Sequence, residues 1–357
     1  EVYLFGIFTR YREEEKGKVV YCQYLITANE ILKRNYLKEL SFSYLGKHQL
    51  TPTFFSKHLK AAIANLGPRF DSKLNFRLPI ALLFNDLAKD TIFKSRLTGI
   101  FDEWLTARFY TSSKHYDIIR EIELEYESIK KDFIDWLSNI DWSPNSSIDI
   151  SSFKSRIIAL SKTAREKRHQ LYDECREIEK TNKTSKRDYN YKSPFESEIS
   201  RLDQIQRFNH IFISNLKGIN ISLSNNPCLI VHGEAGSGKS HLFGDIAYER
   251  SCSEQPTILL LGQLFHSSRG VWQNIFDQLG LSCTKVEFLS SLNSIGEQIG
   301  SRVLILIDAL NEGDGKQLWH NELSGFVKEV SEFSYIGLAL SVRTTYYSSI
   351  IPSQFDG

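Results

Sequence analysis

The chain contains no methionine and only five cysteines among its 357 residues. The cysteines are scattered and form no C-x-x-C pair, which argues against a disulfide framework and against a zinc site. Sparse, unpaired cysteines are typical of a reducing compartment, so we predict a cytoplasmic protein. Because the chain starts at a glutamate and has no methionine anywhere, we also expect that an upstream part of the protein is missing.

Strong net charge and long apolar runs are absent as well. The formal net charge is +1, so no overall electrostatic field points to nucleic acid or to a membrane surface. No apolar run approaches the roughly 20 residues of a membrane span, and no secretory signal opens the chain. With 41% hydrophobic and 24% charged residues the composition is ordinary for a globular protein, and the length predicts two or three domains.

The strongest signal that is present is an uninterrupted G-x-x-x-x-G-K-S motif, which is the Walker A pattern. It follows the apolar run 228–231 and precedes a segment that can form a helix. Glycines let the backbone N–H groups turn toward phosphate oxygens, and the helix N-terminus adds further donors. The predicted phosphate-binding residues are Gly233, Glu234, Ala235, Gly236, Ser237, Gly238, Lys239, Ser240 and His241. The alternative is a glycine-rich turn that matches by chance.

A second motif is the apolar run 302–307 that ends in Asp308, the Walker B arrangement. A buried parallel strand would bring this carboxylate to the sheet edge where ligands bind. We predict that Asp308 and the Ser240 hydroxyl hold Mg²⁺ and that Lys239 contacts the β- and γ-phosphates. Glu312 is the candidate to polarise an attacking water. The alternative for Asp308 is a cap of the next helix.

A third motif is the expected strand 338–342, whose end reads Ser-x-Arg and places Arg343 at the same predicted edge. Arg343 would neutralise or sense the γ-phosphate, and a structural salt bridge is the alternative. Other nucleotide motifs fit less well. A dinucleotide fingerprint needs glycine where the chain has His241, and no N-K-x-D follows the P-loop. ATP with Mg²⁺ is therefore the expected ligand, and we expect its adenine near Arg207 and Phe208.

Strands and helices alternate from residue 228 onward. The expected strands are 229–231, 257–261, 303–307 and 336–342, and the expected helices are 240–249, 271–279, 286–300 and 319–333. Continuous apolar strands separated by helices indicate a parallel sheet that is covered on both faces. The predicted fold class is therefore an α/β P-loop NTPase, preceded by a mostly α-helical domain.

The N-terminal half reads as helical after two strand-like stretches at 1–5 and 18–25. Thr51-Pro52 starts the first expected helix, 81–109 reads as a second helix, and a long hairpin spans 116 to beyond 178. A basic stretch at 162–187 is interleaved with acidic residues, which favours a solvated face over a nucleic-acid contact. The predicted divisions are a tail at 1–50, a helical domain at 51–185, a linker at 186–198 and an ATPase domain at 199–357, incomplete at its C-terminus.

Four segments together resemble the STAND class of NTPases, which is NACHT- and AAA-like, and more narrowly the bacterial antiviral proteins called Avs or AVAST. The segments are 233–242, 260–265, 307–313 and 340–344. Residues 66–80 are similar to a segment upstream of the ATPase in these proteins. The chain departs from the family at Asn311, where a second acidic residue is common, so hydrolysis is expected to be slow or triggered.

The resemblance implies an ATP-dependent oligomerisation switch in antiphage defence. Residues 1–50 would be a connector from a missing N-terminal effector, often a nuclease, whose activity is not encoded here and through which alone DNA would be contacted. A missing C-terminal repeat region would sense a phage protein, and activation would assemble a homo-oligomer, most simply a tetramer. No membrane partner is expected. Two alternatives stay open: a continuously hydrolysing AAA-type ATPase, and an interaction scaffold with a vestigial P-loop.

Overall fold

The computed structural model describes residues 5–7, 21–23, 50–71, 79–108, 115–182 and 194–353. The chain divides into two units, Glu1–Gln49 and Leu50–Gly357. In the first unit β1 (Phe5–Ile7) pairs antiparallel with β2 (Tyr21–Gln23). The stretch predicted at 18–25 contains β2, whereas the stretch predicted at 1–5 falls mostly outside the described residues. All that follows concerns the second unit.

A four-stranded parallel sheet forms the centre of the α/β part. Its strand order is β3-β6-β5-β4, and its strands are β3 (Cys228–Gly233), β4 (Thr257–Leu261), β5 (Val303–Asp308) and β6 (Ile336–Arg343). Every residue of β4 and β5 is buried, which explains why these strands read as unbroken apolar runs. The four strands predicted from the sequence are confirmed, with ends that differ by at most two residues.

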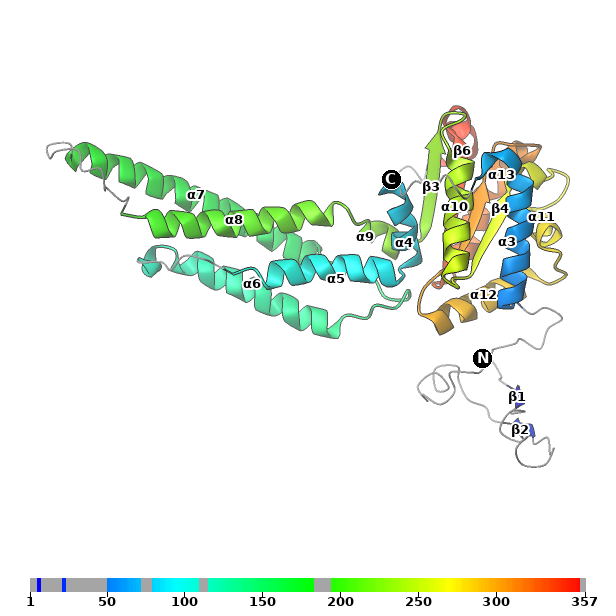
Figure 1. Cartoon of the computed structure of the whole chain (residues 1–357), viewed down its shortest axis with the longest axis horizontal. Helices are drawn as coiled ribbons and strands as arrows, with labels where there is room; N and C mark the ends of the chain where they lie inside the picture. Colours follow the sequence, from blue (N-terminus) through cyan, green and yellow to red (C-terminus); the bar gives the residue numbers. More distant parts are fainter. Residues whose placement is uncertain are drawn as a thin grey trace. The chain divides into compact units, whose positions relative to one another are not determined.

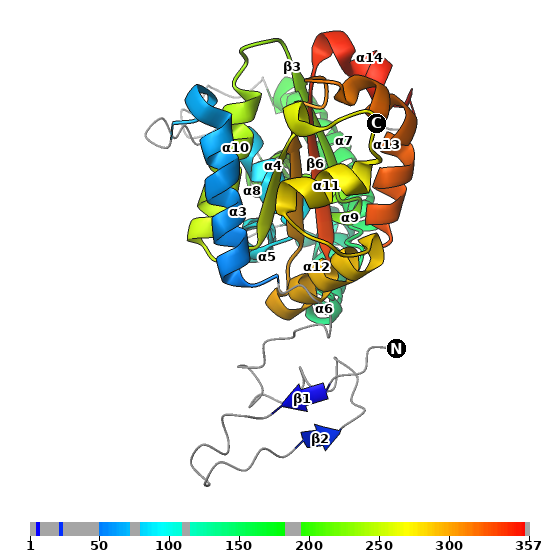
Figure 2. The same ribbon diagram turned by 90° about the vertical axis from the view of Figure 1, so that its right-hand side faces the viewer.

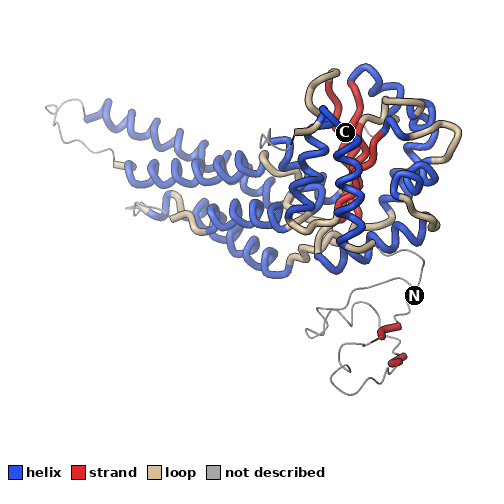
Figure 3. The backbone as a smooth tube through the Cα atoms, turned by 45° about the vertical axis from the view of Figure 1, so that its right-hand side comes forward, coloured by secondary structure: helices blue, strands red, loops and turns tan. Residues whose placement is uncertain are grey.

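Helices cover both faces of this sheet (Figures 2 and 3). One face packs against α11 (Val271–Leu279), α12 (Lys285–Ile299), α13 (Gly315–Ser331) and α14 (Tyr347–Ile350). The other face packs against α3 (Pro52–Leu66), α4 (Leu82–Ala88), α9 (Ile221–Asn225) and α10 (Lys239–Cys252). The predicted α/β arrangement with a doubly covered parallel sheet is thus present. We call the four strands with these eight helices the sheet module.

The place of α3 corrects the predicted domain division. Thr51 caps this helix as expected, because its hydroxyl accepts a hydrogen bond from the Phe54 amide at 3.2 Å. However, the buried residues Leu59, Ala62 and Leu66 pack against the sheet rather than against the other N-terminal helices. A helix assigned from its sequence position to the helical domain therefore belongs to the sheet module.

Four helices form a separate bundle in which they lie side by side (Figure 1). They are α5 (Thr91–Leu105), α6 (Arg120–Asn139), α7 (Ser151–Asn182) and α8 (Glu196–Leu216). The expected hairpin of α6 and α7 is present. The second correction concerns α8, which we assigned to the ATPase domain. Its residues Leu202, Ile205 and Phe212 are buried in the core of this helical bundle. None of the described helices has both the length and the hydropathy to cross a membrane.

The single helix predicted over 81–109 is broken into α4 and α5. Lys89 takes a left-handed conformation at φ 50°, and the Asp90 carboxylate then caps α5 by accepting from the amides of Ile92 and Phe93 at 2.9 and 3.1 Å. Apolar residues continue with helical spacing on both sides of the break, so the sequence pattern conceals it. As a result α4 lies in the sheet module and α5 begins the helical bundle.

Two buried cations join the sheet module to the helical bundle at this break. The Lys89 ammonium donates to the carbonyls of Ser143 and Ser146, which lie in the loop between α6 and α7. The Arg302 guanidinium donates to the carbonyl of Pro144 at 3.1 Å and to that of Leu87 at 3.0 Å. Burial, with some repulsion from Arg302, lowers the pKa of Lys89 to about 8. We call these contacts the junction.

Candidate functional site

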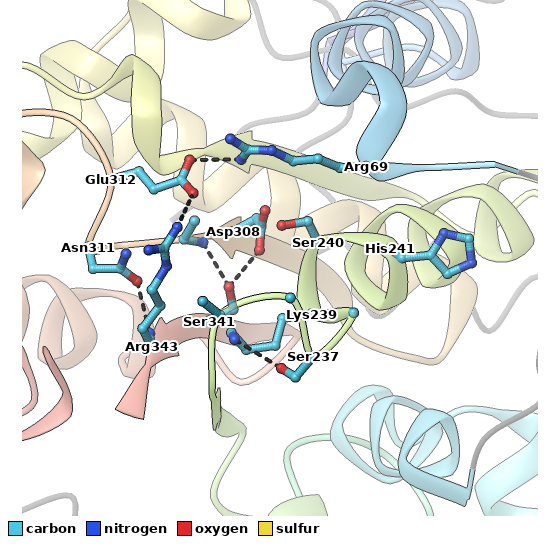
Figure 4. Close-up of a pocket in the computed structure, with 14 residues that line it drawn as sticks. Arg69, Ser237, Lys239, Ser240, His241, Asp308, Asn311, Glu312, Ser341 and Arg343 are labelled. Carbon is cyan, nitrogen blue, oxygen red and sulfur yellow. Dashed lines mark hydrogen bonds and ion pairs between the residues drawn. The ribbon is translucent and has the colours of Figure 1, made fainter. Parts of the chain in front are cut away.

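A cavity of about 280 Å³ opens where β3, β5 and β6 end (Figure 4). Its lining includes Arg69, Ala235, Gly236, Ser237, Gly238, Lys239, Ser240, His241, Asp308, Asn311, Glu312, Ser341 and Arg343. The three predicted motifs therefore meet around one space, although they are far apart in the sequence. Gly233 and Glu234 do not line the cavity, but their carbonyls bind Lys239. Arg69 and Ser341 were not predicted as site residues.

The glycines of the P-loop stand at positions where a residue with a Cβ would be strained or crowded. Gly236 and Gly238 have φ values of 78° and 85°, in the left-handed region. A Cβ on Gly233 would lie 2.9 Å from the Ser237 hydroxyl. Lys239 begins α10 and points back into the loop, where its ammonium donates to the carbonyls of Gly233 and Glu234, each at 2.8 Å. The loop is thus closed around its own lysine.

Asp308 ends β5 and is 2% exposed. Its carboxylate accepts a hydrogen bond from the Ser341 hydroxyl at 2.6 Å, and that hydroxyl in turn accepts from the Ala309 amide at 2.7 Å. Burial raises the pKa of Asp308, and hydrogen bonds from Ser240 and Ser341 oppose this effect. Ser240 and Asp308 both line the cavity and lie near each other (Figure 4), as a pair of magnesium ligands would.

The chemistry of this pair fits magnesium. Hydroxyl and carboxylate oxygens are the donors that Mg²⁺ prefers, and magnesium usually keeps several waters and binds phosphate oxygens as well. Among the described residues, no group of three or more His, Cys, Asp or Glu side chains could hold a metal. Ser240 and Asp308 would therefore suit an ion that arrives with a phosphate ligand, rather than one enclosed by protein alone.

Glu312 lies between two arginines. Its Oε2 is 2.7 Å from Arg69 Nη1, and its Oε1 is 3.4 Å from Arg343 Nη2. The salt bridge that was the alternative role for Arg343 is thus present. The Arg343 backbone amide also donates to the Asn311 side chain at 2.9 Å. Asn311, where the resemblance led us to expect an acid, therefore fixes the end of β6 against the loop after β5.

The loop after β5 is held by an unusually close backbone contact. Ala309 has a left-handed φ of 57°, and its carbonyl oxygen lies where a Cβ on Gly262 would be only 2.1 Å away. The amide of Leu310 donates to the Ser341 carbonyl at 2.9 Å. Gly262, which directly follows β4, and Ser341 of β6 thus contact this loop from two sides and position the backbone next to Asp308.

Arg69 reaches the cavity because the segment after α3 docks on α10. The Phe70 ring packs 5.3 Å from the ring of His241 and 6.3 Å from that of Tyr248, measured between centroids. His241 lines the cavity as predicted, but its ring points away from Glu312 and its Nδ1 accepts from the Asp71 amide at 3.5 Å. No spacing in the sequence signals the Arg69 contact, since 243 positions separate it from Glu312.

The residues expected near the adenine do not lie at this cavity. Arg207 lies on α8, where it pairs with Asp203 at 3.2 Å, and Phe208 packs against the core of the helical bundle. Neither residue lines the cavity. Closeness to the P-loop in sequence misleads here, because α8 runs along the bundle before the chain turns through α9 into β3.

Comparisons of the chain with protein-family models, with curated proteins and with solved structures find no match. The resemblance to antiviral STAND proteins therefore stays a prediction, and the functional argument rests on the geometry of the cavity.

Proposed function

We propose that this protein binds ATP with magnesium and acts as a nucleotide-dependent switch. The observation that carries the proposal is the convergence of Lys239, Asp308 and Arg343 from three separate motifs on one cavity. Each lies at the carboxyl edge of a parallel sheet, where ligands of open α/β folds bind. If the glycine-rich motif were a chance match, there would be no reason for the other two motifs to lie around the same cavity.

The charges of the cavity favour a polyanion. Three cationic side chains and two carboxylates line it, and both arginines are directed at Glu312. The N-terminus of α10 adds backbone donors and the positive end of a helix dipole at the P-loop. Partial burial, helped by the nearby Arg343, lowers the pKa of Lys239, while Asp308 opposes this effect. Lys239 would exchange its carbonyl partners for phosphate oxygens.

Ser240 and Asp308 would hold the magnesium ion. When bound, the ion would supply positive charge that neutralises the phosphate groups. Ser341 keeps the Asp308 carboxylate in place by a hydrogen bond of 2.6 Å. These residues would orient the phosphate chain.

A switch fits this site better than a continuously turning ATPase. Both oxygens of Glu312 are engaged by guanidinium groups, so the carboxylate is not free to accept a proton from an attacking water. Hydrolysis would be slow until Glu312 is released. Steady turnover is the second candidate function, since Glu312 already lies in the cavity. The hydrogen bonds that hold the buried Asp308 carboxylate beside Ser240 and Lys239 favour a working P-loop over a vestigial one.

The wider role follows from the resemblance alone. In that role ATP binding drives a homo-oligomer, for example a tetramer, after a phage protein is sensed by a region outside this chain. An effector outside this chain, such as a nuclease, would then be activated. These steps deepen the proposed switch but do not alter the test of the site.

The test is ATP affinity by titration calorimetry in magnesium buffer, beside single-turnover release of phosphate. We expect Lys239→Ala to weaken ATP binding about a hundredfold, since a lost charge-assisted hydrogen bond costs roughly 3 kcal/mol. The matched control is Lys162→Ala, an exposed lysine on α7 paired with Glu166. Unchanged affinity in Lys239→Ala would refute the proposal. Tight binding with little release supports the switch, whereas steady release abolished by Glu312→Gln supports the continuous ATPase.

A further inference from the structure

Arg69 enters the cavity from an element that belongs neither to the sheet nor to the P-loop. It ends the short helix η2 (Gly67–Arg69), which follows α3 directly. Figure 4 shows its guanidinium reaching across to the Glu312 carboxylate, at the 2.7 Å distance given above. The end of α3 is therefore tied to the residue that would activate a water.

The backbone that carries Arg69 is fixed, while its head group is accessible. A Cβ on Gly244 of α10 would lie 2.8 Å from the Phe70 ring and 2.9 Å from the Leu66 side chain, so α10 has a surface made to receive this segment. Gly67 turns the chain with a φ of 55°. The Arg69 side chain is 44% exposed within the cavity. Such a side chain can change partner without moving its backbone.

Two arginines pair with a single carboxylate beside the P-loop, so one of their two positive charges is not neutralised by it. Arg343 contacts Oε1 of Glu312 and Arg69 contacts Oε2, so each guanidinium uses only part of its five donors on this carboxylate. A phosphate group accepts the same forked hydrogen bonds as a carboxylate and carries more charge. A terminal phosphate in this cavity would therefore compete with Glu312 for the arginines.

We infer that Arg69 is a second arginine of the nucleotide site and a positioning residue for Glu312. Without nucleotide it holds the Glu312 carboxylate. When a nucleoside triphosphate binds, Arg69 transfers its hydrogen bonds to the terminal phosphate and releases Glu312. The inference rests on the proposed function and extends it, because it makes the segment after α3 sensitive to the third phosphate. A diphosphate lacks that group, so Arg69 confers a preference for ATP over ADP.

The test measures ATP and ADP affinities of the whole chain by titration calorimetry in magnesium buffer. We expect Arg69→Ala to weaken ATP binding about tenfold to a hundredfold and to change ADP binding by less than about threefold. Arg69→Lys keeps the charge without the fork, so its loss should be intermediate. The matched control is Arg176→Ala, an exposed arginine on α7 that pairs with Asp173. It should leave both affinities unchanged.

A double-mutant cycle separates positioning from general damage. Glu312→Gln removes the competitor for the arginines, so it should raise ATP affinity several-fold. In the Arg69→Ala background the same change should have a smaller effect, since Arg343 alone remains to be released. Strict additivity of the two substitutions would overturn the inference. Equal thermal unfolding midpoints of the variants show that the affinities compare folded proteins.

Failure of the inference and failure of the proposed function give different results. If Arg69→Ala lowers the ATP and ADP affinities equally, or lowers neither of them, while Lys239→Ala still weakens ATP binding about a hundredfold, the inference is wrong and the nucleotide site stands. If Lys239→Ala binds ATP as the unmodified chain does, both are wrong.

Discussion

The walls of the cavity in the sheet module and the core around Phe133 in the helical bundle bury different kinds of groups. Around the cavity, Asp308, Asn311 and Ser341 are buried polar side chains, and each of them makes a hydrogen bond. In the bundle, the largest buried side chains are rings, and Phe133 lies within 6.1 Å of five other aromatic centroids. The stability of a buried polar cluster depends on the positions of individual hydrogen-bonding atoms, whereas that of an aromatic core depends on how well the ring volumes fill the space.

This difference teaches where function can be placed. Hydrogen bonds fix the orientation of a carboxylate to a fraction of an ångström, which phosphate and metal chemistry require. Ring packing supplies more stability for each residue but tolerates exchange of one ring for another of similar size. The four predictions that follow test the contrast, from the largest expected effect to the smallest.

Removing a ring from the helical bundle should destabilise it strongly without damaging the cavity. Phe133 is fully buried, and Phe133→Ala should lower the free energy of unfolding by about 4 kcal/mol, measured by urea denaturation. Phe133→Leu keeps most of the volume and should lose much less. In conditions where the variant is folded, its ATP affinity should match that of the unmodified chain. A parallel loss of affinity would show that the two regions are not independent.

Adding one methyl group beside the cavity should damage both stability and binding. In Gly262→Ala the new Cβ would lie 2.1 Å from the Ala309 carbonyl oxygen, a backbone atom held from both sides. We expect a loss of about 3 kcal/mol or more and a weaker affinity for ATP, since Asp308 must shift. Gly325→Ala in α13 is the control, because nothing lies within 4 Å of its Cβ. Equal stability of the two variants would contradict the structure.

His58, which lies beside the edge strand β4, should make the sheet module less stable in acid. His58 Nε2 accepts a hydrogen bond from the Leu259 amide at 3.2 Å, and burial lowers the pKa of His58 to about 4 from 6.5. The fold therefore favours neutral His58, and this stabilisation is complete above pH 6.5 and is lost as the pH falls toward 4. The loss should reach roughly 2 to 3 kcal/mol.

His58→Gln isolates this contribution, because a glutamine oxygen can accept the same hydrogen bond but does not titrate. The difference in unfolding free energy between the two proteins, measured across that pH range, should change with pH in the direction stated. If this difference did not change with pH, His58 would have the same pKa in the folded and the unfolded protein.

The smallest expected effect has the opposite sign and lies in the helical bundle. Gly99 is in the middle of α5, and a Cβ there would meet nothing within 4 Å. Gly99→Ala should therefore stabilise the protein by about 0.5 to 1 kcal/mol, because alanine is the better helix former. Thermal unfolding of Gly99→Ala beside Gly262→Ala compares the same substitution in the two regions. A destabilised Gly99→Ala would mean that the outer face of α5 is covered.

The strands and the P-loop could be predicted because local chemistry decides them. Buried parallel strands are apolar on both faces, and a charged residue directly after such a run marks the strand end, as Asp308 and Arg343 do for β5 and β6. The helix starts at Thr51 and Lys239 also follow from adjacent residues. The break at Lys89 could not be predicted, because apolar residues keep helical spacing on both sides of it.

Contacts between segments that are distant in the sequence could not be predicted either, because local patterns do not specify them. Arg69 joins the cavity only because Phe70 docks on α10, and no local pattern encodes that contact. The assignment of α8 to the ATPase domain and the expected closeness of Arg207 to the cavity both relied on distance along the chain, and the structure places both in the helical bundle. Ser341 was visible as part of the third motif, but its bond to Asp308 depends on the pairing of β5 with β6.

The junction has a consequence for how freely this protein can vary. Lys89 and Arg302 donate to the carbonyls of Ser143, Pro144 and Ser146, and every amino acid offers a carbonyl. Almost any residue can therefore replace those three during evolution without removing a partner from the buried cations. The length of the loop is under a different constraint, since a deletion would withdraw the carbonyls themselves. The connection between the sheet module and the helical bundle therefore depends on the course of the backbone in this loop and not on the identity of its side chains.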